Sequence, residues 1–513
     1  MFIWLCLVVL GVSHHVFWRD EVRALSLALQ GDSPVGFFKA IHGEGHPAVW
    51  FVLLRSAYAI FRRPQVLPAL ALVVAIASML ILALRSPFKW PLIGLILFSH
   101  FALFEYSVTA RNYGISMLLV FAFAALYPTH RRRGVVLGGL LFLLANCNVH
   151  SVILAGGFLL LWFIDLLQEN GLKWTAAFRT FALNAAIAAL GVVACALTVF
   201  PTYNDAGVAT APLSQAIPAA IKTIMDPASQ FDELGVPRPV IASLPPQAIG
   251  LALAAQAVLS MLLFAATAGL IRRPGAFVAA LASLIGLALL FAFGVEGGYR
   301  HQALWLVFLI ALYWIHADPR GRLARPAAAQ AVEGGFLIRR AGYFAFVALL
   351  SIQAIVGLFD VFDAVHPGNP WSRSRDLAQL VEGRPDLRQA VVIADPDYLV
   401  EPLAYYVSNP LFLMREHRFG AVVRFTKHAQ LTLSLADVLA NARWLHAQTG
   451  RPVVILLQNR LDQIAPNTPI KEGYDWVFSA TPGQIHDFEA ATIRLARLGP
   501  AITDETFDAY QLR

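Results

Sequence analysis

The chain has 513 residues, of which 58% are hydrophobic and 14% charged, and its mean hydropathy is +0.63. A soluble core cannot hide this much apolar surface, so the composition excludes an ordinary soluble protein and indicates a polytopic membrane protein. The formal net charge of +7 is expected from basic residues in cytoplasmic loops, so it does not indicate a nucleic-acid partner. The three cysteines each lie inside an apolar stretch, which argues against a disulfide framework.

Apolar segments recur as far as residue 360, and many approach the ~20 residues of a membrane-spanning helix. The first segment lacks a basic leader and a small-residue cleavage site, so we expect it to be a retained span. We predict a membrane domain over 1–362 with about 11–13 spans. The twelve candidate segments are 1–18, 47–61, 66–84, 91–104, 114–128, 134–147, 151–168, 178–199, 247–270, 275–294, 301–316 and 341–360.

Arginine clusters orient the second half of this domain. "IRRP" at 271–274 and "RGRLARP" at 320–326 are expected in the cytoplasm, which places 294–301, 200–246 and the C-terminal region outside. The first half is ambiguous, because three apolar segments separate Arg62-Arg63 from the arginines at 131–133. Either one segment is not a simple span or one cluster breaks the positive-inside rule.

The composition changes near 363–370, where two prolines mark a domain boundary. We predict a soluble, extracytoplasmic α/β domain over 371–513, because short β-like bursts alternate with helical stretches at 372–383 and 434–448. The predicted strands are 390–395, 452–457, 475–480 and 505–512. No phosphate loop or nucleophile motif occurs in it, which favours a lid or a partner-binding role.

The predicted first extracytoplasmic loop, at about 19–46, carries the first candidate site residues. Asp20 and Glu21 open the helix-like stretch "DEVRALSLAL", where acidic residues also suit the helix dipole. Neighbouring helical positions project about 100° apart, so only one of the two can be a catalytic base. His42, Glu44 and His46 alternate in "HGEGH" and could bind a divalent metal ion. His46 could also meet a phosphate without any metal.

Two further polar clusters interrupt the apolar background. "EYSVTARNYGI" at 105–115 carries Arg111 and Tyr113, and "EGGYRHQALW" at 296–305 carries Tyr299, Arg300 and His301. An arginine beside lipid is costly unless it reaches a cavity, a partner or the headgroups. Snorkelling to headgroups would explain either arginine alone. All three clusters on one membrane face would indicate a site.

Together "RDE" (19–21), "HPAVWF" (46–51), "ARNY" (110–113) and "GGYRH" (297–301) resemble GT-C membrane glycosyltransferases. The resemblance is to the branch with protein O-mannosyltransferases and the aminoarabinose and galacturonic acid transferases of bacterial lipid A. It implies an inverting transferase of the bacterial inner (plasma) membrane, with its active site extracytoplasmic. The donor would be a polyprenyl-phosphate sugar and the acceptor a hydroxyl of a lipid, glycan or protein.

By this resemblance Asp20 would be the base, with Glu21 beside it orienting a basic neighbour or a metal. Arg111, Arg300, His301 and His46 would bind the donor phosphate, and Tyr113 and Tyr299 would bind substrate. His42 and Glu44 would hold a divalent metal, if one is used. The chain departs from the lipid A enzymes at "GEGHP", where the basic residue before the proline is a histidine.

Three other classes remain as alternatives. An O-antigen ligase or glycan polymerase would use related lipid-linked substrates. A transporter would carry its polar residues near mid-bilayer in broken helices and would show internal repeats, of which none is clear here. A membrane scaffold would tolerate replacement of Asp20.

Overall fold

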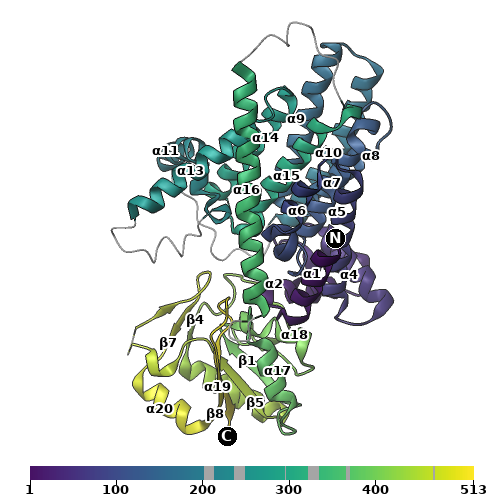
Figure 1. Cartoon of the computed structure of the whole chain (residues 1–513). Helices are drawn as coiled ribbons and strands as arrows, with labels where there is room; N and C mark the ends of the chain where they lie inside the picture. Colours follow the sequence, from purple (N-terminus) through teal and green to yellow (C-terminus); the bar gives the residue numbers. More distant parts are fainter. Residues whose placement is uncertain (201–212, 236–248, 295, 322–333, 366–369, 466–467) are drawn as a thin grey trace.

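The computed structural model describes residues 1–200, 213–235, 249–294, 296–321, 334–365, 370–465 and 468–513. Figure 1 shows a tall bundle of helices joined at one end to a smaller domain that contains the strands. Helix α16 (Gly334–Val365), at 32 residues, runs along the bundle and leads to that domain. The predicted boundary at 363–370 begins inside the last turn of this helix, and 366–369 lie outside the described residues.

Within the described residues, seven helices are long and apolar enough to cross a membrane. They confirm a multi-pass helical membrane protein. They are α5 (Val66–Arg85), α7 (Tyr113–His130), α9 (Val149–Asn170), α10 (Ala176–Val199), α13 (Ile249–Ala268), α14 (Pro274–Phe293) and α16.

This number is below the 11–13 spans expected from the sequence, because several apolar segments form short helices. α1 (Phe2–His14), α4 (Ala48–Phe61), α6 (Trp90–Leu97) and α8 (Val136–Ala145) have 13, 14, 8 and 10 residues. At 1.5 Å per residue none of these reaches the ~30 Å of a hydrocarbon core. Apolar composition by itself therefore did not predict membrane crossing.

Helix α15 (Tyr299–Ala317) lies at the centre of the bundle, with every residue from Gln302 to Ile315 buried. A helix that is apolar on all sides suits such a position. Phe88, just beyond α5, packs against Trp314 near the C-terminal end of α15, with ring centroids 6.4 Å apart. Glu105 lies 3.6 Å from Arg300 at the N-terminal end of the same helix. The chain between Phe88 and Glu105 therefore runs along the length of α15.

That return pass is broken rather than absent. It consists of α6 and a π-helical turn, η1 (Phe101–Glu105). Because α5 also contacts α2 (Arg19–Ala28) and α4 at the domain junction, the chain makes three passes between Arg62 and Arg131. Arg62-Arg63 and Arg131 consequently lie at opposite ends of the bundle. The three apolar segments are therefore three passes, and one of the two arginine clusters does not follow the positive-inside rule.

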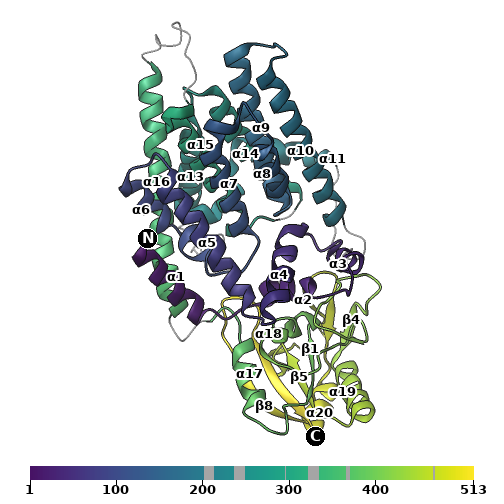
Figure 2. The same ribbon diagram turned by 90° about the vertical axis from the view of Figure 1, so that its right-hand side faces the viewer.

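The first two helices form an elbow at the junction of the two parts. α1 and α2 are bent by 85° relative to each other. The backbone N–H of Phe17 donates to the Tyr406 hydroxyl (2.7 Å), and Arg375 donates to the His15 carbonyl (2.6 Å). Figure 2 shows α2, α3 (Pro34–Ile41) and α4 between the bundle and the C-terminal domain. The C-terminal domain thus fixes the helix that carries Asp20.

The C-terminal domain has a strand within each of the four predicted stretches, and further strands that the sequence did not predict. β1 (Val391–Asp395), β5 (Val453–Leu457), β8 (Thr492–Leu498) and β9 (Phe507–Leu512) form a sheet in the order β1-β5-β9-β8. β1 and β5 are parallel, and the other pairs are antiparallel. A second sheet has the order β4-β7-β6, formed by Thr432–Ser434, Val477–Ser479 and Ile470–Lys471.

The helices of this domain also agree with the sequence prediction. α17 (Ser374–Glu382) falls within the predicted stretch 372–383, and α19 (Leu435–Thr449) matches the predicted stretch 434–448 to one residue at each end; α18 (Leu403–Tyr406) and α20 (Pro482–Ala491) are further helices. β1 and β5 are buried on both faces, which explains their unbroken apolar runs. The domain therefore has a hydrophobic core of its own, distinct from that of the bundle.

Candidate active site

A cavity of about 690 Å³ lies between the helical bundle and the C-terminal domain. Its walls come from α2, the segment before α4, the N-terminal ends of α7 and α15, and loops of the C-terminal domain. The helices α2, α4, α7 and α15 all begin at this cavity. Helix N-termini carry partial positive charge, so their convergence favours an anionic ligand.

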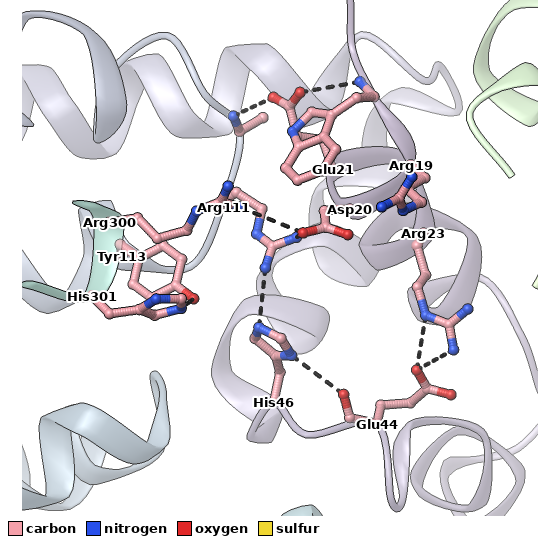
Figure 3. Close-up of polar contacts among 12 residues, drawn as sticks. Arg19, Asp20, Glu21, Arg23, Glu44, His46, Arg111, Tyr113, Arg300 and His301 are labelled. Carbon is pink, nitrogen blue, oxygen red and sulfur yellow. Dashed lines mark hydrogen bonds and ion pairs between the residues drawn. The ribbon is translucent and has the colours of Figure 1, made fainter. Parts of the chain in front are cut away.

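Asp20 and Glu21 diverge, as expected for neighbouring positions of a helix. Asp20, Arg23, Ala24 and Leu27 line the cavity, a spacing that marks one face of α2. Glu21 lies on the opposite, fully buried face (Figure 3). Of the two acids, only Asp20 can therefore reach a ligand in the cavity.

Asp20 lies between two arginines from distant parts of the chain. Its Oδ2 is 2.9 Å from Nη1 of Arg111 and 3.4 Å from Nη1 of Arg300. Both contacts use the same oxygen, so Oδ1 takes part in neither. Burial alone would raise the pKa of Asp20, but the charges of the two arginines outweigh it and hold the pKa at about 2. Asp20 is thus ionised at physiological pH.

Glu21 holds the segment that presents Arg111. Its Oε1 accepts the backbone N–H of Ala110 (2.7 Å), and its Oε2 accepts from His15 Nε2 (2.7 Å) and the Trp18 N–H (3.3 Å). The side chain therefore connects the α1–α2 elbow to the residue before Arg111. This geometry favours a positioning role and places Glu21 away from the cavity.

His46 meets Arg111 as a neutral hydrogen-bond acceptor. Its Nδ1 lies 3.3 Å from the Glu44 carbonyl, and its Nε2 lies 3.2 Å from Nη2 of Arg111. A carbonyl only accepts and a guanidinium only donates, so Nδ1 carries the proton and Nε2 is bare. Burial and the charge of Arg111 lower the pKa of His46 to about 4. His46, expected to be a cation, instead orients the arginine that supplies the positive charge.

His301 also differs from the expected phosphate-binding cation. Its Nδ1 accepts the N–H of Gly298 (3.0 Å), so Nε2 carries the proton toward the Tyr113 hydroxyl (2.7 Å). The Tyr113 oxygen accepts this hydrogen bond, and its own hydrogen remains available to a ligand. Tyr113 lines the cavity, as a substrate-binding residue must, and His301 fixes its orientation.

The remaining predicted site residues do not converge on Asp20. Tyr299 points into the bundle, where its hydroxyl is bonded to Gln353 and its ring packs on His100 at 4.1 Å. At the first position of α15 it projects about 100° from Arg300, which explains why only one of them reaches the cavity. His42, at the end of α3, is not among the residues that line the cavity.

The residues proposed for a metal do not form a ligand set. Glu44 pairs with Arg23 (2.6 Å), and the bare nitrogen of His46 faces Arg111. Two guanidinium groups thus occupy the positions of a cation. In the part of the chain that the structure describes, no group of three or more His, Cys, Asp or Glu side chains is placed to hold a metal ion. We route no chemical step through a metal.

Sequence reasoning missed one wall of the cavity. Arg23 bridges Glu44 to Glu401 of the C-terminal domain, and Phe425 and Tyr474 of that domain also line the cavity. The helical spacing of Asp20 and Arg23 was a usable signal, since positions three apart share a face. Nothing local marks the three residues of the C-terminal domain, because tertiary packing alone brings them to α2.

The fold and the cavity define a multi-pass helical membrane protein whose C-terminal domain closes a charged cavity at one end of the bundle. No protein-family model, curated protein or solved structure matches the chain. Its function is therefore inferred from the cavity and the sequence motifs.

Proposed function

We propose that this protein is an inverting glycosyltransferase that moves a sugar from a polyprenyl-phosphate donor to a hydroxyl acceptor. We place the reaction at the extracytoplasmic face of the bacterial inner membrane. The observation that carries the proposal is Asp20, an ionised carboxylate between Arg111 and Arg300, in a cavity at the end of an apolar bundle. A lipid-linked donor anchored beside the helices would present its phosphate and sugar at this depth.

The proposed step uses the charges that line the cavity. The acceptor oxygen attacks the anomeric carbon, the bond from that carbon to the phosphate oxygen breaks, and the phosphate leaves with the electron pair. The acceptor's proton passes to Asp20. Arg111 and Arg300 stabilise the charge that grows on the departing phosphate, an interaction stronger in the transition state than in the ground state.

Arg111 and Arg300 also link donor binding to the basicity of Asp20. While both arginines face Asp20, its low pKa makes it a weak base. A donor phosphate that draws the guanidinium groups toward itself would weaken these contacts and raise the proton affinity of Asp20. We therefore expect the base to gain strength when the donor is in place.

The first test compares Asp20→Asn with Asp32→Asn, a matched change at an exposed acid just beyond α2. Mass spectrometry of gently purified protein should detect a polyprenyl phosphate or its sugar adduct bound to the wild-type protein and to both variants. Sugar transfer should fall by ~10²-fold or more in Asp20→Asn, because the amide cannot take the proton. Near-normal transfer by Asp20→Asn, or the absence of bound lipid, would remove the proposal.

A further inference from the structure

The wall that the C-terminal domain contributes to the cavity differs in chemistry from the wall around Asp20. Around Asp20, two arginines face one carboxylate. On the wall next to the C-terminal domain, one helical turn along α2 from Asp20, Arg23 lies between the side chains of Glu44 and Glu401. The first wall suits an anion. The second has a single arginine shared by two acids, so it attracts a phosphate less and suits a neutral ligand with several hydroxyl groups.

An aromatic stack stands on this second wall. The rings of Phe425 and Tyr474 are stacked with centroids 3.9 Å apart, and Trp476 lies behind Phe425 at 5.6 Å. Tyr474 is 47% exposed, whereas Phe425 is buried, so the stack is covered on one side and open on the other. Both residues have positive φ, 41° at Phe425 and 63° at Tyr474, a backbone conformation that residues other than glycine rarely adopt.

Glu401 adds to this wall a carboxyl oxygen that has no hydrogen-bond partner among the described residues. Its Oε1 accepts the N–H of Val423 (2.7 Å) and pairs with Arg23. Its Oε2 is buried and has no hydrogen-bond partner among the described residues. A buried carboxyl oxygen without a partner is costly, so a ligand hydroxyl that forms a hydrogen bond with it would be favoured.

We propose that Tyr474, Phe425 and Glu401 form the acceptor subsite and that the acceptor group is a pyranose sugar. This inference rests on the glycosyltransferase function proposed above. One face of a pyranose ring is apolar and can lie on an aromatic ring, while its hydroxyls form hydrogen bonds with Glu401 and Glu44. Arg23 lies one helical turn from Asp20 on α2, so a ring held beside Arg23 can present a hydroxyl to the base.

The test measures sugar binding to the full-length protein in detergent by saturation-transfer-difference NMR, with methyl hexopyranosides as probes. We expect the ring C–H protons to receive saturation from the protein. Tyr474→Asn should weaken this signal at least about fivefold, because asparagine tolerates the positive φ but offers no ring. Tyr474→Phe keeps the ring and should keep the signal. Glu401→Gln should also weaken it.

Three controls decide the outcome. Phe419→Ala removes an aromatic ring that is 51% exposed in the same domain but outside the cavity, and should leave the signal unchanged. Mannitol, with similar hydroxyls and no ring, should give no Tyr474-dependent signal. Equal binding by Tyr474→Asn, or a stronger Tyr474-dependent signal from a serine-containing peptide, would overturn the subsite.

The assay uses neither donor nor turnover, so it separates the two proposals. Normal transfer by Asp20→Asn together with Tyr474-dependent sugar binding would reject the transferase and retain a sugar-binding site. A lipid-bound protein that needs Asp20 for transfer but binds pyranosides independently of Tyr474 would retain the transferase and reject the subsite.

Discussion

At the scale of single residues, the site depends on how two adjacent acids are separated. Asp20 faces the cavity and is 32% exposed, whereas Glu21 is fully buried and bonded to Ala110 and His15. Two neighbouring acidic residues thus serve two different purposes. Asp20 is available for chemistry, and Glu21 fixes the backbone that leads to Arg111.

Glu21→Gln should therefore damage the fold more than Asp20→Asn. Glu21 accepts three hydrogen bonds through its two carboxylate oxygens. Glutamine replaces one of these oxygens with an NH2 group that can only donate and would face another donor, at a cost of about 2–3 kcal/mol. We expect a clear fall in the thermal midpoint of the purified protein, together with weaker donor binding, because Ala110 precedes Arg111. A Glu21→Gln protein as stable as Asp20→Asn and with normal donor affinity would contradict this positioning role.

At the scale of elements, helix ends create the site. α7 begins beside Arg111 and α15 begins beside Arg300, and both arginines meet at one oxygen of Asp20. The two helices are 18 and 19 residues long, so a shift of either would move its arginine relative to Asp20. The broken pass of α6 and η1 returns the chain to the cavity end of the bundle, where Arg111 follows.

Arg111→Gln and Arg300→Gln should each weaken donor binding by roughly 10-fold to 100-fold, the worth of a hydrogen bond to a charged group. Because both arginines contact the same carboxylate, their effects should not add, and a double-mutant cycle should show coupling above about 0.5 kcal/mol. Titration of a polyprenyl phosphate into each variant measures this. Arg320→Gln, at the far end of α15, serves as the control and should bind normally; strict additivity would refute the shared contact.

At the scale of the whole molecule, the C-terminal domain docks on the bundle through acids that carry raised pKa values. Burial raises the pKa of Glu401 to about 7 and that of Glu505 to about 8, despite the nearby arginines of α2. Glu505 accepts the N–H of Arg19 (2.7 Å), and Glu401 pairs with Arg23. The docking surface and the cavity therefore share the helix that carries Asp20.

These pKa values predict that stability falls as the pH rises. Between pH ~4.5 and ~7 the folded protein keeps a proton on Glu401 that the unfolded chain has lost, which favours folding at the acidic end by up to about 3 kcal/mol. The thermal midpoint of the full chain should thus be higher at pH 5 than at pH 8. Glu401→Gln should flatten this slope, and Glu382→Gln, at an exposed acid, should not. An unchanged slope in Glu401→Gln would refute the assignment.

The sequence by itself determined the membrane class and four strands of the C-terminal domain, because these depend on local composition and periodicity. It did not predict the short strands β4 and β6 or the edge strand β8. It also selected Asp20, Arg111 and Arg300, since charged residues are conspicuous in an apolar background. Tertiary structure alone decided the number of long spans, because helix length and not apolarity sets membrane crossing. It also decided the neutral states of His46 and His301, the buried role of Glu21 and the wall formed by Glu401, Phe425 and Tyr474, because these follow from contacts between segments far apart in the chain.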